Sequence, residues 1–190
     1  IFTLPLDHFS GAVYHAGNTS APETERLILK STSGNAMTSD DAGYWNDTAP
    51  TSTVFSIGTR KHTNSNGGVV AYVFAEIEGY SKFGSYTGNG NADGIFVYTG
   101  FRPAWLMIKR TGTSGTSGWS IFDNKRNTFN PVDTILQANT TGTDGTSYPI
   151  DFLSNGFKVR DSGSTHNQNN SPHIYMAFSN GQNFKFGNSR

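Results

Sequence analysis

The acidic pair in Glu76-Ile77-Glu78 is the feature of this sequence that comes nearest to acid–base chemistry. In an extended strand, residues i and i+2 project from one face, so both carboxyl groups would share a surface. Retaining glycoside hydrolysis uses two carboxyls about 5 Å apart, one as acid and one as nucleophile. The next three residues are Gly, Tyr and Ser, so no third acid follows. The favoured interpretation is a solvated strand end, and a glycan depolymerase is the weaker alternative.

A calcium-like pattern opens in the segment from Asn89 to Gly94, where oxygen-bearing side chains alternate before a glycine. The twelfth position of that pattern is Gly100, where calcium binding requires a bidentate Glu. A tight hairpin between two strands is therefore favoured over a metal site.

Other reactive residue types give no catalytic arrangement. The five histidines show no ligand-like pairing, and the chain has no cysteine. No Gly-x-Ser-x-Gly elbow is present, so acyl transfer has no visible nucleophile. We therefore expect a protein that is not an enzyme, with no catalytic residue, no metal and no cofactor.

Two clusters combine a tryptophan with amide and carboxylate side chains and suit recognition better than catalysis. Sugar sites pair an aromatic face, which stacks on a pyranose, with Asn and Asp groups that bind hydroxyls. In the alternative interpretation, each tryptophan packs in the core. The predicted ligand-binding residues are Tyr44, Trp45, Asn46 and Asp47 in the first cluster, and Trp119, Asp123, Asn124 and Arg126 in the second.

The composition narrows the kind of protein that could present these residues. Aromatic residues make up 13% of the chain and charged residues 15%, while Gly, Ser, Thr and Asn are abundant. This balance is typical of a turn-rich β protein. Acids and bases number 14 each, so no basic field exists for nucleic acid. Apolar runs such as Ala104–Ile108 are too short to cross a bilayer, so we expect no membrane insertion.

Short alternating or apolar runs recur between turn dipeptides and predict an all-β, antiparallel, two-sheet sandwich or barrel. At 190 residues, one domain over 1–190 is the better prediction. The predicted strands are Ala12–Tyr14, Arg26–Lys30, Thr53–Gly58, Val69–Ala75, Gly94–Thr99, Ala104–Lys109, Trp119–Phe122, Thr134–Ala138, Gly156–Arg160 and His173–Phe178.

Internal repeats in the sequence indicate two related halves, about 10–86 and 117–189, joined by a hairpin region at 87–116. The first half lacks a long front segment, so it is either truncated or uses Ile1–Phe9 as an edge strand, where Pro5 is tolerated. The matching segments are Ser10–Tyr14 with Ser117–Phe122, Ile28–Ser31 with Ile135–Ala138, Phe55–Gly58 with Phe157–Arg160, Val70–Ala75 with Ile174–Ser179, and Lys82–Gly84 with Lys185–Gly187.

Word-like runs over about residues 40 to 179 resemble a duplicated domain of marine bacteriophage structural proteins. The runs are Trp45–Ser56, Glu78–Gly90, Ile121–Arg126, Asp151–Lys158 and Tyr175–Phe178. The resemblance implies a concanavalin A-like jelly roll on the virion exterior, in a tail fibre, a tail appendage or a capsid decoration. It also implies partners among other virion proteins and copies of the same chain, and contact with host-surface glycans.

Two functions of different classes follow from these patterns. The first is a structural virion protein that assembles through protein–protein contacts, with exposed strand edges packed against neighbours. The second is a lectin-like module that recognises host-surface glycans. The exposure of Trp45 and Trp119 discriminates between them, because buried indoles offer no platform for a sugar.

Overall fold

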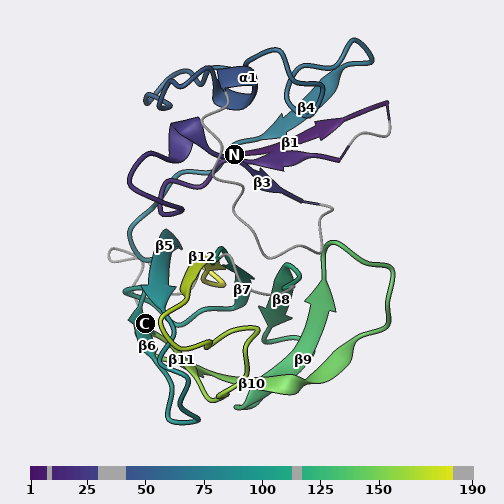
Figure 1. Ribbon diagram of the computed structural model, residues 1–190. Coiled ribbons are helices and arrows are strands. Elements are labelled where there is room, and N and C mark those ends of the chain that lie inside the picture. The colour runs from purple at the N-terminus through teal and green to yellow at the C-terminus, as the bar shows by residue number, and fades with distance from the viewer. Residues whose placement is uncertain (8–9, 30–41, 113–116, 182–190) are drawn as a thin grey trace.

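The structure is a computed structural model that describes residues 1–7, 10–29, 42–112 and 117–181. These residues form an all-β protein with two antiparallel sheets of four and eight strands (Figure 1). The described helices are short: a 3-10 turn, η1, spans Pro22–Thr24 and α1 spans Ala42–Trp45. No helix in this part of the chain is long and apolar enough to span a membrane. The predicted all-β class and the two antiparallel sheets are confirmed.

The smaller sheet is built from the N-terminal part of the chain and has the order β3-β2-β1-β4. Its strands are β1 (Phe2–Pro5), β2 (Ala12–Val13), β3 (Leu27–Ile28) and β4 (Val69–Tyr72). The prediction of an N-terminal edge strand is wrong, because β1 lies between β2 and β4. Pro5 is tolerated because it lies at the strand end, beyond the pairing of β1 with β2.

The larger sheet has the order β5-β12-β7-β8-β9-β10-β11-β6 and curls on itself. The rings of Phe157 on β11 and Tyr175 on β12 have centroids 5.3 Å apart, although four strands lie between β11 and β12 in the sheet order. The enclosed core includes Leu106, Ile108 and Phe122. The strands are β5 (Ser81–Thr87), β6 (Phe96–Tyr98), β7 (Trp105–Arg110), β8 (Ser120–Asp123), β9 (Val132–Gln137), β10 (Gly145–Leu153), β11 (Gly156–Val159) and β12 (Pro172–Phe178).

A second core joins the two sheets. Met107 on β7 and Met176 on β12 project from the opposite face of their strands and pack with Val13 and Leu27 of the smaller sheet. Strands β7 and β12 are therefore covered on both faces, which explains why their sequences are continuous apolar runs without alternation. The chain consequently stacks its smaller sheet on the outside of the curled larger one (Figure 1).

The strand predictions fail at three places. Thr53–Gly58 is not a strand, and Val54 and Ile57 within it are exposed. Strand β5 was missed because Gly and Ser interrupt its apolar residues, and β10 because Pro149 lies within it. Three of the matched segments belong to strands in both halves, whereas Phe55–Gly58 is irregular and its match Phe157–Arg160 contains β11.

The neighbour relations in the two sheets share one pattern. In the smaller sheet the order β4-β1-β2-β3 places the last strand beside the first, and the others follow in sequence. In the larger sheet β12-β7-β8-β9 is arranged in the same way. The larger sheet continues past β12 to β5, whereas β4 is the last strand of the described smaller sheet.

Candidate functional site

The first predicted cluster lies on α1 and the turn after it. Trp45 is only 1% exposed and packs edge-on against the Tyr14 ring, with centroids 5.8 Å apart. Tyr44 is also buried, and its hydroxyl pairs with His62 Nδ1 at 3.3 Å. Asn46 and Asp47 are exposed, with the positive φ angles that end the helix. The amide and the carboxylate are thus accessible, but the indole is not.

The second predicted cluster is not brought together in space. Trp119 is 2% exposed, lies in the core between the sheets, and donates its indole N–H to Ile28 O at 3.2 Å. Asp123 is at the other end of β8, about 13 Å away at a strand's rise per residue. Its Oδ1 accepts backbone N–H groups from Lys125 and Arg126, both at 2.9 Å, so it shapes the turn.

Of the two remaining polar residues of the second cluster, Arg126 has acidic partners for its side chain, and Asn124 is held through its backbone. The Arg126 guanidinium lies 3.5 Å from Asp123 and 3.6 Å from Asp144. The backbone N–H of Asn124 donates to Ala104 O at 3.0 Å. Since both tryptophans are buried, neither predicted cluster offers a stacking face to a sugar.

The carboxylates of Glu76 and Glu78 do not share a strand face, because the chain turns here. Ile77 bridges to Ser81, and Gly79 takes the positive φ that the tight turn needs. Glu76 accepts hydrogen bonds from Lys82 Nζ and from the backbone N–H of Phe83, both at 2.9 Å. Partial burial raises the pKa of Glu76, but these donors outweigh it and hold the pKa below its usual value. A general acid at neutral pH needs the opposite shift.

The segment Asn89–Gly94 forms a loop whose oxygens already have donors. The buried Asn167 amide binds Asn89 Oδ1 at 2.8 Å and Asn91 O at 2.7 Å. The Asp93 carboxylate pairs with Lys158 Nζ at 2.6 Å. The hairpin prediction is wrong, because β5 and β6, which this loop joins, pair with β12 and β11 and not with each other. The predicted hairpin region at 87–116 is wrong as well, since β6 does not pair with β7 either. Asn167, from a distant part of the sequence, holds the loop instead.

A pocket of about 430 Å³ opens where this acidic turn meets the end of β6. Tyr98 of β6 is 65% exposed there, and Phe96, two residues earlier on the strand, is also exposed. The residue between them, Val97, is buried in the core. The pocket is lined by Glu76, Ile77, Glu78, Gly79, Ser81, Lys82, Tyr98, Thr99 and Gly100.

Strand β6 also forms an edge of the larger sheet, since among the described residues it pairs only with β11. Edge strands of natural proteins are usually protected by charge or proline, whereas this one carries two exposed aromatic rings. The sequence does not single out this site, because Phe96 and Tyr98 are ordinary strand residues by type. The available signal was their alternation with Val97, which puts both rings on the outer face.

A second exposed surface follows β4, the edge of the smaller sheet. Val70, Tyr72, Val73 and Phe74 are between 39% and 59% exposed. Beside them lies an apolar groove of about 500 Å³ between the two sheets. We call it the β4 groove, and it is lined by Phe2, Leu4, Leu29, Tyr72, Phe74, Trp105, Met107, Met176 and Phe178.

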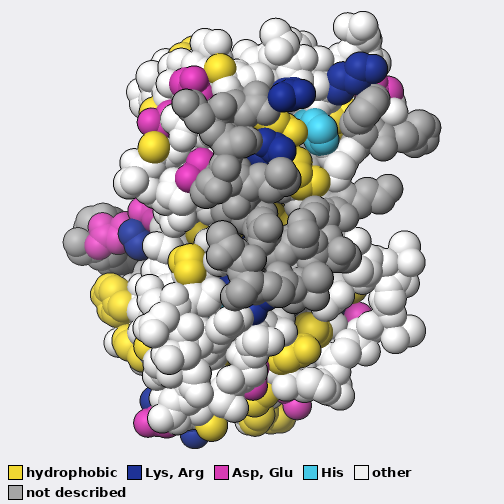
Figure 2. Space-filling view, viewed as in Figure 1, with side chains coloured by type: hydrophobic (Ala, Val, Ile, Leu, Met, Phe, Trp, Pro, Cys, Tyr) yellow, Lys and Arg dark blue, Asp and Glu magenta, His cyan; other side chains and the backbone are white. Residues whose placement is uncertain are grey.

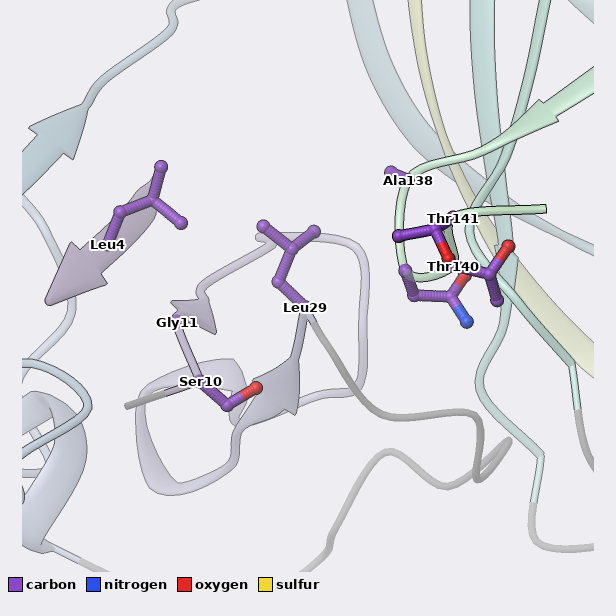
Figure 3. Close-up of a pocket in the computed structure, with 8 residues that line it drawn as sticks. Leu4, Ser10, Gly11, Leu29, Ala138, Thr140 and Thr141 are labelled. Atoms are coloured by element: carbon purple, nitrogen blue, oxygen red, sulfur yellow. The ribbon is translucent and has the colours of Figure 1, made fainter. Parts of the chain in front are cut away.

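The β4 groove adjoins a more polar pocket of about 520 Å³. Figure 3 shows Leu4 and Leu29 on its smaller-sheet side, with Ala138, Thr140 and Thr141 of the loop after β9 across from them. Leu4 and Leu29 line both cavities. On the face in Figure 2, the described acidic and basic side chains are scattered among uncharged ones.

The fold and these surfaces define an all-β protein with two stacked antiparallel sheets and aromatic or apolar residues at two exposed sheet edges. The chain belongs to the family described as Domain of unknown function (DUF7483), whose model matches residues 7–181. No match is found among curated proteins or among solved structures.

Proposed function

We propose that this chain is a non-enzymatic structural protein of a bacteriophage virion exterior, a capsid decoration or tail appendage that assembles through protein–protein contacts. The proposed contact surface is supported by the exposed β6 edge, where Phe96 and Tyr98 are both exposed and Tyr98 lines a pocket together with the exposed Ile77. Aromatic residues are enriched in interface centres because each buries a large area at small entropic cost. The location on a virion is supported by the resemblance of residues 40–179.

The finer architecture is part of the same proposal. We infer a concanavalin A-like jelly roll that arose by duplication, with its two copies contributing the β4-β1-β2-β3 and β12-β7-β8-β9 groups. The shared strand order supports the duplication. The contact between the rings of Phe74 and Phe178, 5.8 Å apart, supports it too, since these residues are matched in the two halves.

The second candidate function is lectin-like recognition of host-surface glycans. It is favoured by the pocket beside Tyr98, which combines an exposed aromatic ring with the carboxylate of the exposed Glu78. This is the chemistry that binds a pyranose, and it replaces the buried Trp45 and Trp119. Depolymerase activity is not favoured, because the pKa of Glu76 is lowered by its donors.

One pair of variants separates these functions. We expect the wild-type chain to self-associate and Phe96→Ser with Tyr98→Ser to remain monomeric, as measured by sedimentation velocity. The matched control is Phe129→Ser, which alters another exposed phenylalanine and should assemble like wild type. A wild-type chain that stays monomeric at high concentration contradicts self-assembly. Glycan-array binding that Tyr98→Ser abolishes would establish the lectin-like function instead.

A further inference from the structure

Strand β12 of the larger sheet has a neighbouring strand on both sides, whereas β4, which we match to it, has one on a single side among the described residues. Strand β12 pairs on one side with β7 and on the other with β5, from Ser81 opposite Phe178 to Thr87 opposite Pro172. Strand β4 pairs with β1 alone among the described residues. If β4 corresponds to β12, the place that corresponds to β5 is open in the described smaller sheet.

Strand β5 reaches its place by crossing between the two sheets. It follows β4 in the chain, but it adds to β12 rather than to β4. Strand β5, which follows the β4-β1-β2-β3 group in the chain, therefore adds a fifth strand to the β12-β7-β8-β9 group. If the two groups are related by an approximate two-fold axis, the segment that follows β12 would add a fifth strand to the β4-β1-β2-β3 group, beside β4.

The sequence after β12 has the residues for this exchange. Phe184-Lys185-Phe186-Gly187 repeats the Lys-Phe-Gly of β5, at Lys82–Gly84. These C-terminal residues lie outside the described part of the chain. We propose that Phe184–Gly187 pairs with the open edge of β4 in the same chain and inserts the Phe186 ring into the β4 groove.

The register follows from the matched pairs. On β12, Met176 lies opposite Phe83 and Ala177 opposite Lys82. The matched runs equate Met176 with Tyr72 and Ala177 with Val73. Phe186 therefore lies opposite Tyr72, and Lys185 lies opposite Val73. Because side chains alternate along a strand, Phe184 and Phe186 share one face and Lys185 takes the other.

The β4 groove has the walls that Phe186 needs. Phe83 lies opposite Met176, and its ring is 6.4 Å from Phe74 and 5.9 Å from Phe178. Exchanging the two halves turns these three neighbours into Tyr72, Phe178 and Phe74. All three line the groove, so Phe186 would meet the same kind of aromatic contacts that Phe83 already makes.

The same chain brings the start of this segment close to the β4 edge. Phe178 ends β12 and its ring touches Phe74 at the end of the open edge. Ser179 bonds to the backbone of Gly79 and Tyr80, and the Gly181 N–H donates to Ser179 Oγ, so the free reach of the chain begins at Gly181. An extended chain from Gly181 to Phe184 covers about 10 Å. A short tether gives the segment a high effective concentration at β4, so a second copy competes poorly for the site.

An engineered disulfide tests the pairing directly, because the chain has no cysteine. Val73→Cys with Lys185→Cys places two thiols on directly opposite residues, whose Cα atoms are about 4.5 to 5.5 Å apart in an antiparallel pair. That separation suits a disulfide. The register control is Val73→Cys with Gly187→Cys, whose partners are diagonal and too far apart to bridge.

We expect the Val73/Lys185 double variant of the full chain to form an intrachain disulfide on mild oxidation. Non-reducing electrophoresis should show a faster-migrating monomer, and peptide mass mapping should identify the bridge. The Gly187 control should remain largely reduced. No bridge at Val73, an equal yield in the control, or only a disulfide-linked dimer would each overturn the proposal, the last because a second copy would then occupy β4.

A second measurement does not depend on disulfide geometry. Phe186→Ala should lower the melting temperature by several degrees and increase the fluorescence of an added apolar dye, since it empties the β4 groove. Asn188→Ala, which lies just past the paired segment, is the matched control and should leave both readings unchanged. An unchanged melting temperature in Phe186→Ala overturns the proposed insertion of the ring.

Discussion

His166 and His173 are both buried in the larger sheet, where neither ring is readily charged. His173 stacks on Tyr86 with ring centroids 4.8 Å apart, and His166 packs edge-on against Phe122 at 5.3 Å. Burial, assisted by the nearby Arg110 charge, lowers the pKa of His166 to about 3 and that of His173 to about 4. The hydrogen bond to Ser171 O acts in the opposite direction on His173 but is outweighed.

The lowered pKa values of these two histidines predict that the folded protein loses stability in acid. Unfolding restores a pKa of about 6.5, so the unfolded chain binds more protons below that pH. The stabilising contribution of a neutral buried histidine is therefore complete above pH 6.5 and declines as the pH falls toward 4. Urea unfolding at pH 7.5 and pH 5 should show a lower free energy of unfolding at pH 5.

The variant His166→Phe should weaken this pH dependence, because it removes one proton-binding group and keeps the ring contacts with Phe122. Each pKa unit corresponds to about 1.4 kcal/mol per group. The free energy of unfolding should therefore change measurably less between pH 7.5 and pH 5 in the variant than in the wild type. Equal pH dependence in the variant and the wild type would show that His166 is not the group responsible.

Trp119 is expected to matter for stability and not for ligand contact. Its ring fills the core between the sheets and its N–H satisfies Ile28 O. Trp119→Ala should cost about 3 to 5 kcal/mol in urea unfolding, and Trp119→Phe should cost less because it keeps most of the apolar volume. A loss below 1 kcal/mol for the alanine variant would contradict this packing role.

At the level of elements, the larger sheet depends on a close approach of β11 to its edge strand. A Cβ on Gly156 would lie 2.1 Å from the backbone oxygen of Val97 on β6. Backbone cannot swing aside as a side chain does, so β6 would have to separate from β11. The position therefore fixes where the exposed Phe96 and Tyr98 are held.

Gly156→Ala is expected to destabilise the protein by about 1 to 3 kcal/mol through overpacking, with the largest loss of order in β6. Hydrogen exchange should show reduced amide protection at residues 96–98. Gly142→Ala is a suitable control, because its nearest neighbour would be the Thr140 hydroxyl at 3.6 Å, an ordinary contact. Undiminished protection of β6 in Gly156→Ala would show that the edge tolerates the added methyl group.

Strand positions were largely predictable from sequence, because runs such as Trp105–Ile108 and Ile174–Phe178 are apolar and bounded by turns. Strands such as β5 and β10, which the apolar pattern does not predict, show the limit of that signal. In β5, Gly84 lies under the Tyr175 ring, where a side chain would not fit, so its place in the sheet depends on a distant partner. The candidate site escaped prediction for a related reason, since the pocket joins β6 to a turn more than a dozen residues earlier.

At the scale of the whole molecule, the sequence predicted two layers but not which strands are covered twice. The continuous apolar runs of β7 and β12 carry that information, because a strand with one solvated face alternates. The tryptophans were ambiguous for the same reason. An indole can stack on a sugar or fill a core, and only the packing of the smaller sheet onto the larger one decides for Trp119.

The covered faces of β7 and β12 make the two sheets dependent on each other. Strands of two to four residues, as in the smaller sheet, have little stability without a packing partner. The larger sheet in turn would expose Met107 and Met176 if the smaller one separated. We therefore expect one cooperative unfolding transition for the whole chain.

Fluorescence can test this cooperativity in the double variant Trp105→Phe with Trp119→Phe. In that variant Trp45, which packs on the smaller sheet, is the sole tryptophan reporter. Its urea midpoint should coincide with that of far-ultraviolet circular dichroism, which is dominated by the larger sheet. An earlier Trp45 transition would mean that the smaller sheet unfolds on its own and that its contact with β7 and β12 contributes little to stability.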